Sequence, residues 1–330
     1  MLPSLEAIAW DHPGLHVIPN APLSNYTRFG LGGPALLLAD ASTEDALIQA
    51  IQTARSANLP LEIIGGGSNL VAADEGVPGL VLRYTHAKLR NEPNGVNACA
   101  GAILQNLVDM TIESGLQGLE TMTGIPGWLG GAVYGNAGAY GHSIQELVES
   151  VRFFDGSAIR EIGNAACEFR YRESVFKRHK DWVILSARFK MDRADPAELK
   201  AEADGILKIR NEKYPPTLRC AGSIFKNLIR RDLPASVQAQ VPASVVREGK
   251  VPSAYFLEKV GAKGMILGGI QVATYHANLL YNAGGGTAAQ VSELIGTLKS
   301  RVRSTYGLEL EEEVQYLCGP VTSPSEIIRP

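Results

Sequence analysis

The segment at residues 124–141, which reads GIPGWLGGAVYGNAGAYG, constrains the fold of this chain more than any other. Seven of its 18 positions are glycine, and alanine stands between several of them. Each glycine inside a helix costs roughly 1 kcal/mol relative to alanine, so regular structure alone does not account for this composition. A flexible linker is also a poor explanation, because linkers are polar, whereas Ile, Trp, Leu, Val and Tyr are interleaved here. We therefore expect something bulky and flat to lie directly against this backbone.

A second glycine segment lies earlier in the chain. An apolar stretch at residues 61–64, expected as a buried strand, runs directly into Gly65–Gly67 and then into Ser68-Asn69-Leu70. Consecutive glycines allow neighbouring N–H groups to converge on one anion, and a pyrophosphate is the natural occupant. The spacing matches neither the GxGxxG dinucleotide fingerprint nor the GK[ST] of a P-loop. From these residues alone, a phosphate site and an ordinary tight turn both remain open.

Composition restricts the class of protein further. The 330 residues are enough for about two domains, and 45% hydrophobic with 20% charged residues is typical of a soluble globular enzyme. The formal net charge of -3 gives no support to nucleic-acid binding through bulk positive charge. We find no apolar run of the roughly 18 residues needed to span a bilayer, and no signal-peptide pattern at the N-terminus. The four cysteines lie far apart without a CxxC pair, so we expect no zinc site and a reducing cytoplasm.

Hydrophobic periodicity and turn residues predict strands and helices in alternation. Expected strands lie at residues 37–39, 61–64, 79–84, 95–100, 151–155, 158–162, 182–191, 222–226, 269–274 and 308–317. One helix is expected after the capping-box sequence that begins at Ser42, and others at residues 103–113, 194–209, 254–260 and 287–302. Because Asp195-Pro196 begins a charged helix and Pro215-Pro216 follows it, we place a domain boundary near residues 192–196.

Together, the two glycine segments resemble the UDP-N-acetylenolpyruvoylglucosamine reductase (MurB) family. Further segments fit in the family's order: the NYTRFGLGGPA sequence from Asn25, CEFRYRESVFK from Cys167, AGSIFKN from Ala221, HAN from His276 and LEEEV from Leu310. The resemblance runs from about residue 20 to 320 and implies an α+β fold. An FAD-binding domain of the vanillyl-alcohol-oxidase (PCMH) type is expected at residues 20–193, with subdomains at about 20–85 and 86–193. A smaller α+β substrate-binding domain is expected at 194–322, with its C-terminal strand returning to the active site.

The resemblance also implies a reaction, that of a UDP-N-acetylmuramate dehydrogenase. In this family, NADPH reduces non-covalently bound FAD, and the flavin then reduces an enolpyruvyl ether on UDP-N-acetylglucosamine to a lactyl ether. The product is UDP-N-acetylmuramate, a precursor of peptidoglycan. The implied partners are a UDP-sugar and NADPH, with no nucleic acid and no membrane insertion, and we expect a cytoplasmic monomer.

Three residues in matching motifs are expected to carry the chemistry. Hydride addition leaves negative charge on an enolate beside a carboxylate, and Arg172 is the expected stabiliser because a guanidinium binds such groups in bidentate fashion. Ser223 matches the family's proton donor, and Cys220 is a weaker alternative because on a strand it would face the other side. Glu313 matches the family's carboxylate. Glu311 remains the alternative, because period two places both on one face with the intervening glutamate pointing away.

Further residues are implied to bind the cofactor and the substrate. The expected FAD-binding residues are Gly65, Gly66, Gly67, Ser68, Asn69, Leu70, Gly124, Ile125, Gly130, Gly131, Ala132, Asn136, Gly138 and Arg210. The expected substrate-binding residues are Tyr171, Lys213, Asn227 and Asn278. No residue is expected to bind a metal ion.

Two other functions remain open. One is another FAD-dependent oxidoreductase of the same fold, such as a carbohydrate or hydroxy-acid oxidase, which often holds FAD covalently through His or Cys. His142 follows the long glycine segment, but residues 65–70 contain neither residue type. The other is a non-catalytic nucleotide-sugar binding protein, which would not need Arg172, Ser223 and a C-terminal acid together. The stretch at residues 228–250 is longer than in the compact form of the family, and its role is open.

Overall fold

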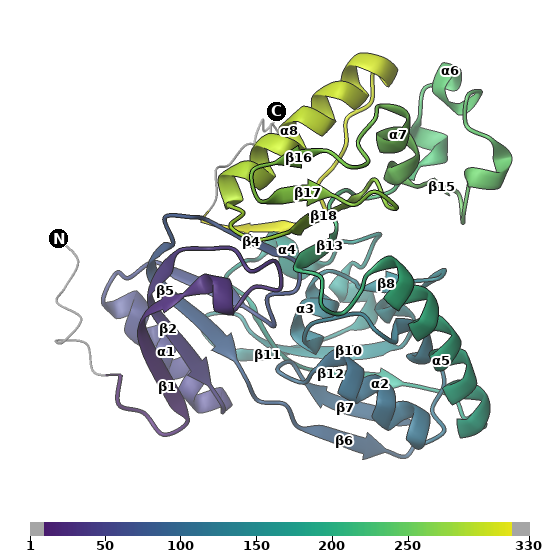
Figure 1. Cartoon of the computed structure of the whole chain (residues 1–330). Coiled ribbons are helices and arrows are strands. Elements are labelled where there is room, and N and C mark those ends of the chain that lie inside the picture. The colour runs from purple at the N-terminus through teal and green to yellow at the C-terminus, as the bar shows by residue number, and fades with distance from the viewer. Residues whose placement is uncertain (1–9, 319–330) are drawn as a thin grey trace, which may run out of the picture. The chain divides into compact units, whose positions relative to one another are not determined.

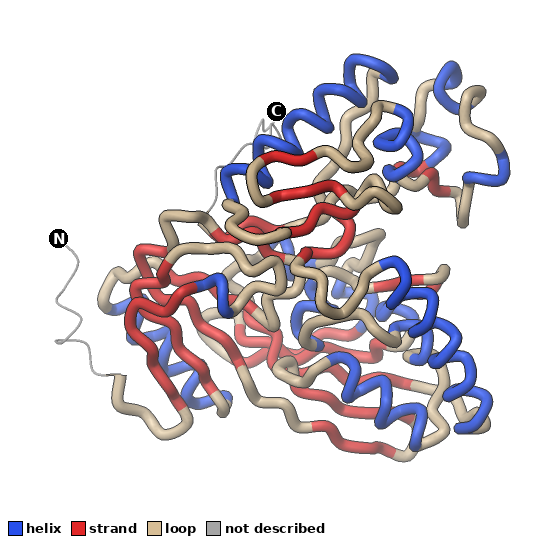
Figure 2. The backbone as a smooth tube through the Cα atoms, in the orientation of Figure 1, coloured by secondary structure: helices blue, strands red, loops and turns tan. Residues whose placement is uncertain are grey.

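The computed structural model describes residues 10–318, and Figures 1 and 2 draw its helices, strands and loops. The chain divides into two α+β units. The first unit runs through Ala21 and continues with Ala35–Ser68 and Pro78–Leu218; the second comprises Pro22–Pro34, Asn69–Val77 and the chain from Arg219 onward. Two expectations concern residues outside this range. One is the absence of a signal peptide, which involves residues 1–9, and the other is the end of the second domain at residue 322.

The expected domain boundary at residues 192–196 is wrong. Helix α5 (Pro196–Lys213) belongs to the first unit, because its buried Leu199 and Ala203 join the hydrophobic core there. Asp195 caps the helix by accepting a hydrogen bond from the N–H of Ala197 at 2.7 Å. The chain passes to the second unit only after Leu218. The sequence did not reveal which core this charged helix joins, because few of its positions are buried.

The first unit begins with a four-stranded sheet and one helix (Figure 1). The strand order is β1 (Leu15–Pro22), β2 (Pro34–Ala41), β5 (Val77–Tyr84) and β3 (Leu61–Ile64). Strands β3 and β5 run parallel, as a connection through a crossover requires. Helix α1 (Glu44–Ser56) starts at Thr43, whose side chain accepts from the N–H of Ala46; the N-cap is therefore Thr43 and not the expected Ser42.

A second sheet in the first unit is antiparallel throughout. Its strand order is β11 (Ile159–Gly163), β10 (Val148–Phe154), β12 (Val183–Lys190), β7 (Gly95–Cys99) and β6 (Leu89–Glu92). The shorter elements beside it are α2 (Leu104–Glu113), α3 (Leu129–Tyr134), α4 (Val175–Arg178), β8 (Gly138–Ala139) and β9 (His142–Ser143). The predicted hairpin forms between β10 and β11 across Asp155-Gly156, where Asp155 accepts from the N–H groups of Ser157 and Ala158.

The second unit has its own sheet, with helix α8 (Ala288–Tyr306) lying along it in Figure 1. The sheet order is β13 (Cys220–Ser223), β18 (Leu279–Asn282), β17 (Ile270–Val272) and β16 (Ile266–Leu267). Two strand pairs complete the unit, β14 (Leu228–Ile229) with β15 (Lys250–Val251) and β4 (Leu70–Ala72) with β19 (Gln315–Leu317), together with helices α6 (Ala235–Gln238) and α7 (Ser253–Lys259). The predicted capping box of α8 forms between Thr287 and Gln290.

Two loops from the N-terminal half belong to the second unit because their apolar residues fill its core. Phe29 and Leu31 are buried there, and so is Val71. Gly33 is required by close packing, since a Cβ at this position would lie 2.2 Å from the carbonyl oxygen of Asp74. These long-range contacts join segments that are far apart in the sequence.

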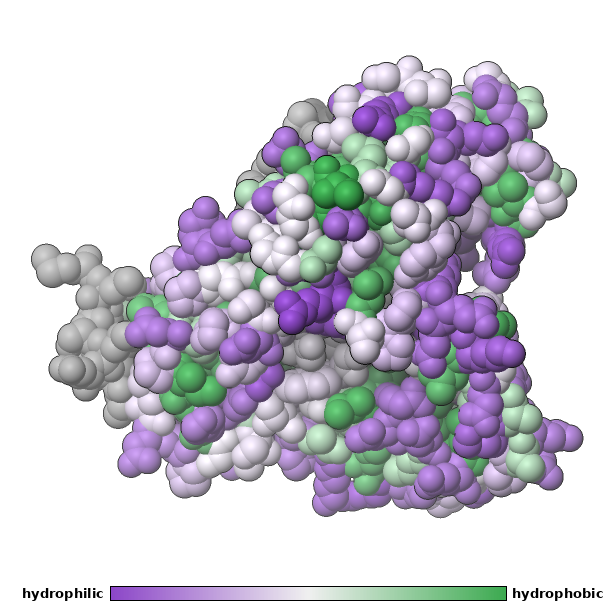
Figure 3. Space-filling view, in the orientation of Figure 1, coloured by the Kyte–Doolittle hydropathy of each residue, from purple (hydrophilic) through white to green (hydrophobic). Residues whose placement is uncertain are grey.

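The surface carries charged and apolar residues in mixture. Hydrophilic residues are spread across the face drawn in Figure 3, where hydrophobic residues form small separate groups. Within residues 10–318, none of the helices combines the length and the apolar character needed to cross a bilayer.

The contact between Asp74 and α8 generates a stability prediction. The Asp74 carboxylate accepts from the N–H of Ala288 at 2.8 Å and from that of Ala289 at 3.0 Å, so it satisfies two donors in the first turn of the helix. Asp74→Ala should lower the free energy of unfolding by about 1–2 kcal/mol, measured by urea denaturation. Glu75→Ala, at the exposed neighbouring position, is the control and should change it by less than about 0.5 kcal/mol. Equal losses in the two variants would contradict this capping role.

Candidate active site

The structure brings the two glycine segments of the first unit together. A Cβ placed on Gly65 would lie 3.9 Å from the backbone nitrogen of Gly131. One placed on Gly66 would lie 2.9 Å from the indole of Trp128, and one on Gly127 would lie 2.5 Å from Ser68 Oγ. The turn after β3 therefore packs directly against the start of α3.

The glycines of the long segment serve two different purposes. Gly138 is required by the protein itself, because a Cβ there would lie 2.3 Å from the carbonyl oxygen of His142. Gly124 has φ +77°, which side chains rarely adopt. Gly131, in contrast, is exposed while its helical neighbours Leu129 and Ala132 are buried, and a Cβ on it would meet no atom within 4 Å. Packing does not explain glycine at this position, whereas a flat ring lying against α3 would.

Arg172 points back to the same glycine segment. It stands in a tight turn in which Arg170 and Glu173 exchange two backbone hydrogen bonds, and its φ is +58°. Its guanidinium Nη2 donates to the carbonyl of Gly138 at 3.0 Å and lies over the ring of Tyr171, with 5.5 Å from Cζ to the ring centroid. A left-handed arginine stores backbone strain of the kind that is common at functional sites.

Arg210 reaches the other end of the glycine segment from α5. A Cβ on Gly124 would lie 3.3 Å from Arg210 Cδ, so the arginine stem packs on this glycine. Arg210 and Lys213 both lie over the ring of Tyr214, at 5.8 Å and 5.3 Å from its centroid. The last turn of α5 thus carries two cations, of which Arg210 packs on the beginning of the glycine segment.

The side chain of Asn136 is hydrogen-bonded within the protein. Its side chain is 2% exposed, and its Nδ2 donates to Arg170 O at 2.8 Å and to Gln145 Oε1 at 3.1 Å. It therefore ties the glycine segment to the turn that carries Arg172. Asn136 thus positions the loop through these bonds, and its expected contact with the cofactor stays a prediction.

Ser223 lies at a bulge in β13 of the second unit. The pairing with β18 shifts by one residue between Cys220↔Tyr281 and Ser223↔Leu279, and Gly222 between them has φ +77°. Cys220 is fully buried, whereas Ser223 is partly exposed. The bulge therefore turns the serine toward the surface and leaves the thiol in the core.

The C-terminal segment returns to the residues that follow Ser223. The N–H of Glu313 donates to the carbonyl of Ile224 at 2.7 Å, and the N–H of Lys226 donates to that of Glu311 at 2.9 Å. The expected strand at 308–317 is shorter than predicted, because β19 covers only Gln315–Leu317 and a single bridge at Glu312 precedes it. The segment with the expected acid therefore bonds the residues directly after Ser223, while Ser223 itself pairs with Leu279.

The three consecutive glutamates face different partners. Glu311 forms an ion pair at 2.5 Å with Lys226, whose side chain is 8% exposed. Glu312 pairs with Lys299 at 2.9 Å and accepts from the hydroxyl of Tyr316 at 2.6 Å. Burial, and secondarily Glu312, raise the pKa of Tyr316. Glu311 and Glu312 are thus each paired with a lysine, and Glu313 as the acid stays a prediction. Lys226 was overlooked in the sequence, although it stands next to Asn227 in the FKN motif.

Asn278 holds the main chain beside Ser223. It is 2% exposed, its Oδ1 accepts from the N–H of Phe225 at 2.9 Å, and its Nδ2 donates to the carbonyl of Phe225 at 2.8 Å. Its own carbonyl accepts from the N–H of Ile224 at 3.1 Å. This arrangement favours a structural role over the expected contact with substrate. Asn227, in contrast, is exposed.

Asn69 and Leu70 contact the C-terminal segment, and their expected contact with the cofactor stays a prediction. The chain passes from the first unit to the second between Ser68 and Asn69, so the expected cofactor motif belongs to both. The Asn69 side chain donates through Nδ2 to the carbonyl of Glu313 at 2.9 Å, and Leu70 pairs with Gln315. Gly65–Ser68 are thus the members of the motif that stay with the long glycine segment.

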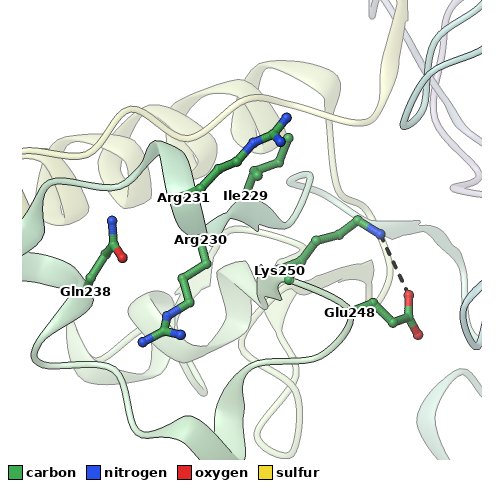
Figure 4. A pocket seen from close by; sticks show the side chains of 7 residues that line it. Ile229, Arg230, Arg231, Gln238, Glu248 and Lys250 are labelled. Atoms are coloured by element: carbon green, nitrogen blue, oxygen red, sulfur yellow. Dashed lines mark ion pairs between the residues drawn. The ribbon is translucent and has the colours of Figure 1, made fainter.

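The open stretch at residues 228–250 encloses a surface cavity of about 450 Å³ between β14, α6 and β15 (Figure 4). Arg230 and Arg231 point to different sides of the chain, and Lys250 is directed to Glu248, 3.7 Å away. The cations do not converge on one point, so we assign no ligand to this cavity.

His142, the residue that a covalent flavin link would use, is engaged elsewhere. Its Nδ1 lies 2.8 Å from a carboxylate oxygen of Glu146, and this hydrogen bond raises the pKa of the imidazole. Among residues 10–318, no group of His, Cys, Asp and Glu side chains has the arrangement of a metal site.

Two family models match separate parts of the chain. A family model described as an FAD binding domain matches residues 35–159, which contain both glycine segments. A model described as the C-terminal domain of UDP-N-acetylenolpyruvoylglucosamine reductase matches residues 214–317, which contain Ser223 and Glu313. The start of the second match also supports a boundary after α5 rather than before it.

Individual proteins give the same result over nearly the whole chain. UDP-N-acetylenolpyruvoylglucosamine reductase from Solibacter usitatus is 58% identical over 305 residues, covering 92% of this chain and 98% of that protein. The same enzyme from Rubrobacter xylanophilus is 35% identical, covering 91% and 94%. The crystal structure of MurB from Thermus caldophilus superposes with a TM-score of 0.70 at 28% identity, covering 92% of this chain and 98% of that one. This chain belongs to the UDP-N-acetylenolpyruvoylglucosamine reductase family.

Proposed function

We propose that this chain reduces UDP-N-acetylenolpyruvoylglucosamine to UDP-N-acetylmuramate in the cytoplasm, with NADPH as reductant and non-covalently held FAD as cofactor. Family membership and the FAD-binding domain support the reaction class. The observation that carries the assignment of residues is the hydrogen bond from the N–H of Glu313 to the carbonyl of Ile224. This bond places the main chain of Glu313, the expected acid, beside the residue that follows Ser223, the expected proton donor.

The first unit supplies the residues that would hold FAD. Gly65–Ser68 form the turn suited to a pyrophosphate, Gly131 provides open space for a flat ring, and Arg210 packs on Gly124 at the end of the same segment. When bound, FAD supplies the hydride that reduces the enolpyruvyl group. The amide of Asn136 and the small residues Gly130 and Ala132 then act by shaping the backbone around that ring.

The residues of this chain stabilise the negative charge that develops on the substrate and supply the proton that quenches it. Hydride addition at the terminal carbon breaks the C=C π bond and moves its electron pair toward the carbon next to the carboxylate. Arg172 stabilises the resulting enolate, because its guanidinium is already fixed by the Gly138 carbonyl and needs little reorganisation. The Oγ–H of Ser223 then gives its proton to that carbon, and solvent returns a proton to the serine through Glu313. The balance is one hydride, which carries two electrons and comes from NADPH by way of FAD, and one proton from water.

The first prediction concerns the space beside Gly131. Gly131→Val should yield folded but colourless protein, because a Cβ at this position meets no protein atom within 4 Å while the valine side chain occupies the proposed ring position. Flavin absorbance of the purified variant, and its thermal unfolding compared with flavin-free wild type, measure the two effects. Gly138→Val is the contrast, since its Cβ would collide with His142 O and destabilise even flavin-free protein. Yellow Gly131→Val protein would contradict the proposed site, and flavin that stays with acid-precipitated wild type would favour the oxidase alternative.

The second prediction separates the two half-reactions. Ser223→Ala should keep normal bleaching of the flavin by NADPH, because that step transfers no proton to substrate carbon. Reoxidation by the enolpyruvyl substrate should slow by roughly 10²–10⁴-fold, the usual loss for a general acid. Stopped-flow absorbance of the flavin measures both steps. Equal slowing of the two would show that the serine is structural.

The third prediction distinguishes the two candidate glutamates. Glu313→Gln should slow reoxidation by about 10²-fold or more, as expected when an acid–base group is lost. Glu311→Gln should slow it by less than about fivefold, because the Glu311 side chain is 69% exposed and its change removes the ion pair with Lys226 but no group that transfers the proton in the proposed mechanism. The reverse order in the same stopped-flow assay would assign the acid to Glu311.

A further inference from the structure

Asn69 connects the glycine turn to the acid of the second unit. Its Nδ2 donates to the carbonyl of Glu313 at 2.9 Å, and its own carbonyl accepts from the N–H of Gln315, also at 2.9 Å. These two bonds lie on either side of Val314, which is 3% exposed and belongs to the core of the second unit. The asparagine therefore fixes the main chain at the acid rather than reaching only toward a ligand.

The contact is the first step of a longer ladder. Strand β4 continues from Asn69 and runs parallel to β19, with Leu70 opposite Gln315 and Ala72 opposite Leu317. On its other side, the N–H of Glu313 is held by the carbonyl of Ile224 at 2.7 Å. Both polar groups of the Glu313 main chain are thus bonded, one to the segment that carries Ser223 and one to the segment that leaves the glycine turn.

We propose that Asn69 is a positioning residue for the acid. Its amide sets the direction of the Glu313 main chain, and so of the carboxylate, relative to Ser223. The Glu313 carbonyl faces Asn69 before the regular β4–β19 pairing begins at Leu70, and Asn69 Nδ2, at 2.9 Å, is a nearer donor to it than Gln315 Nε2, at 3.4 Å. This inference rests on the proposed function, and it assigns Asn69 a task beyond the cofactor contact expected from its motif.

Asn69→Asp tests the donor without changing the size of the side chain. At neutral pH the carboxylate offers no donor and repels the Glu313 carbonyl, so the acid loses its position. Reoxidation by the enolpyruvyl substrate should then fall by about 10²-fold relative to flavin reduction in the same variant, the size expected for a small misplacement of a catalytic group. Below its pKa, which is ordinarily near 4 and is raised by a neighbouring carbonyl, the protonated aspartate can donate as asparagine does. The ratio of variant to wild-type reoxidation should therefore rise as the pH falls from about 8 to about 5.

Hydrogen exchange gives a readout that requires no flavin. In flavin-free Asn69→Asp protein at neutral pH, amide exchange in a peptide covering residues 311–317 should be faster than in wild type. Peptides from the five-stranded sheet of the first unit should be unchanged. Asn91→Asp is the matched control, because Asn91 is exposed, its side chain is hydrogen-bonded to that of Ser114, and it is remote in sequence from this ladder. It should show neither the pH-dependent ratio nor the faster exchange.

Several outcomes would overturn the inference. Asn69→Asp protein that loses its flavin, yet reoxidises normally after refilling, would make Asn69 a cofactor ligand only. Equal slowing of both half-reactions, or unchanged exchange at residues 311–317, would remove the link to Glu313. Wild-type protein that the enolpyruvyl substrate does not reoxidise would refute the proposed function instead, and the exchange experiment would still decide whether Asn69 holds the C-terminal segment.

Discussion

The short ladder around Glu313 is the interaction on which the proposed proton chemistry depends. Three segments that are far apart in the sequence meet in it: the loop after the glycine turn, the bulged strand with Ser223, and the C-terminal segment. Asn69 Nδ2 donates to the Glu313 carbonyl, and the Glu313 N–H donates to the Ile224 carbonyl. Because an unpaired buried backbone group is costly, a shift in one segment carries the others with it.

In the first unit, the proposed flavin site depends instead on glycines, which leave the backbone without side chains. Close packing explains glycine at Gly66 and Gly138, where a Cβ would collide with Trp128 or with the His142 carbonyl. It does not explain Gly131, which is exposed and has no neighbour that a Cβ would meet. A glycine-rich segment therefore contains both structural positions and ligand-facing ones, and only the three-dimensional packing separates them. The position that packing leaves unexplained is the informative one for the flavin.

Local patterns predicted most elements, and long-range contacts account for what they missed. The strand at residues 61–64 and the capping box of α8 follow from periodicity and from side chains three residues apart, so the sequence specifies them directly. The domain boundary was misplaced because α5 buries few residues, and hydropathy does not reveal which core receives them. Motifs located Asn69, Asn136 and Asn278 but not the direction of their amides, because each bonds backbone that is distant in sequence or lies across a turn.

The boundary between Ser68 and Asn69 shows why one motif can carry two constraints. Up to Ser68 the chain must expose N–H groups and tolerate a positive φ at Gly67, and glycine meets both needs. From Asn69 the chain must join a parallel ladder, where the Glu313 carbonyl requires a donor that the backbone does not provide. A serine at this position is one atom shorter and would not span the same gap, whereas asparagine reaches it with its amide. The glycines therefore meet a requirement of the first unit and the asparagine meets one of the second, although they are neighbours in the sequence.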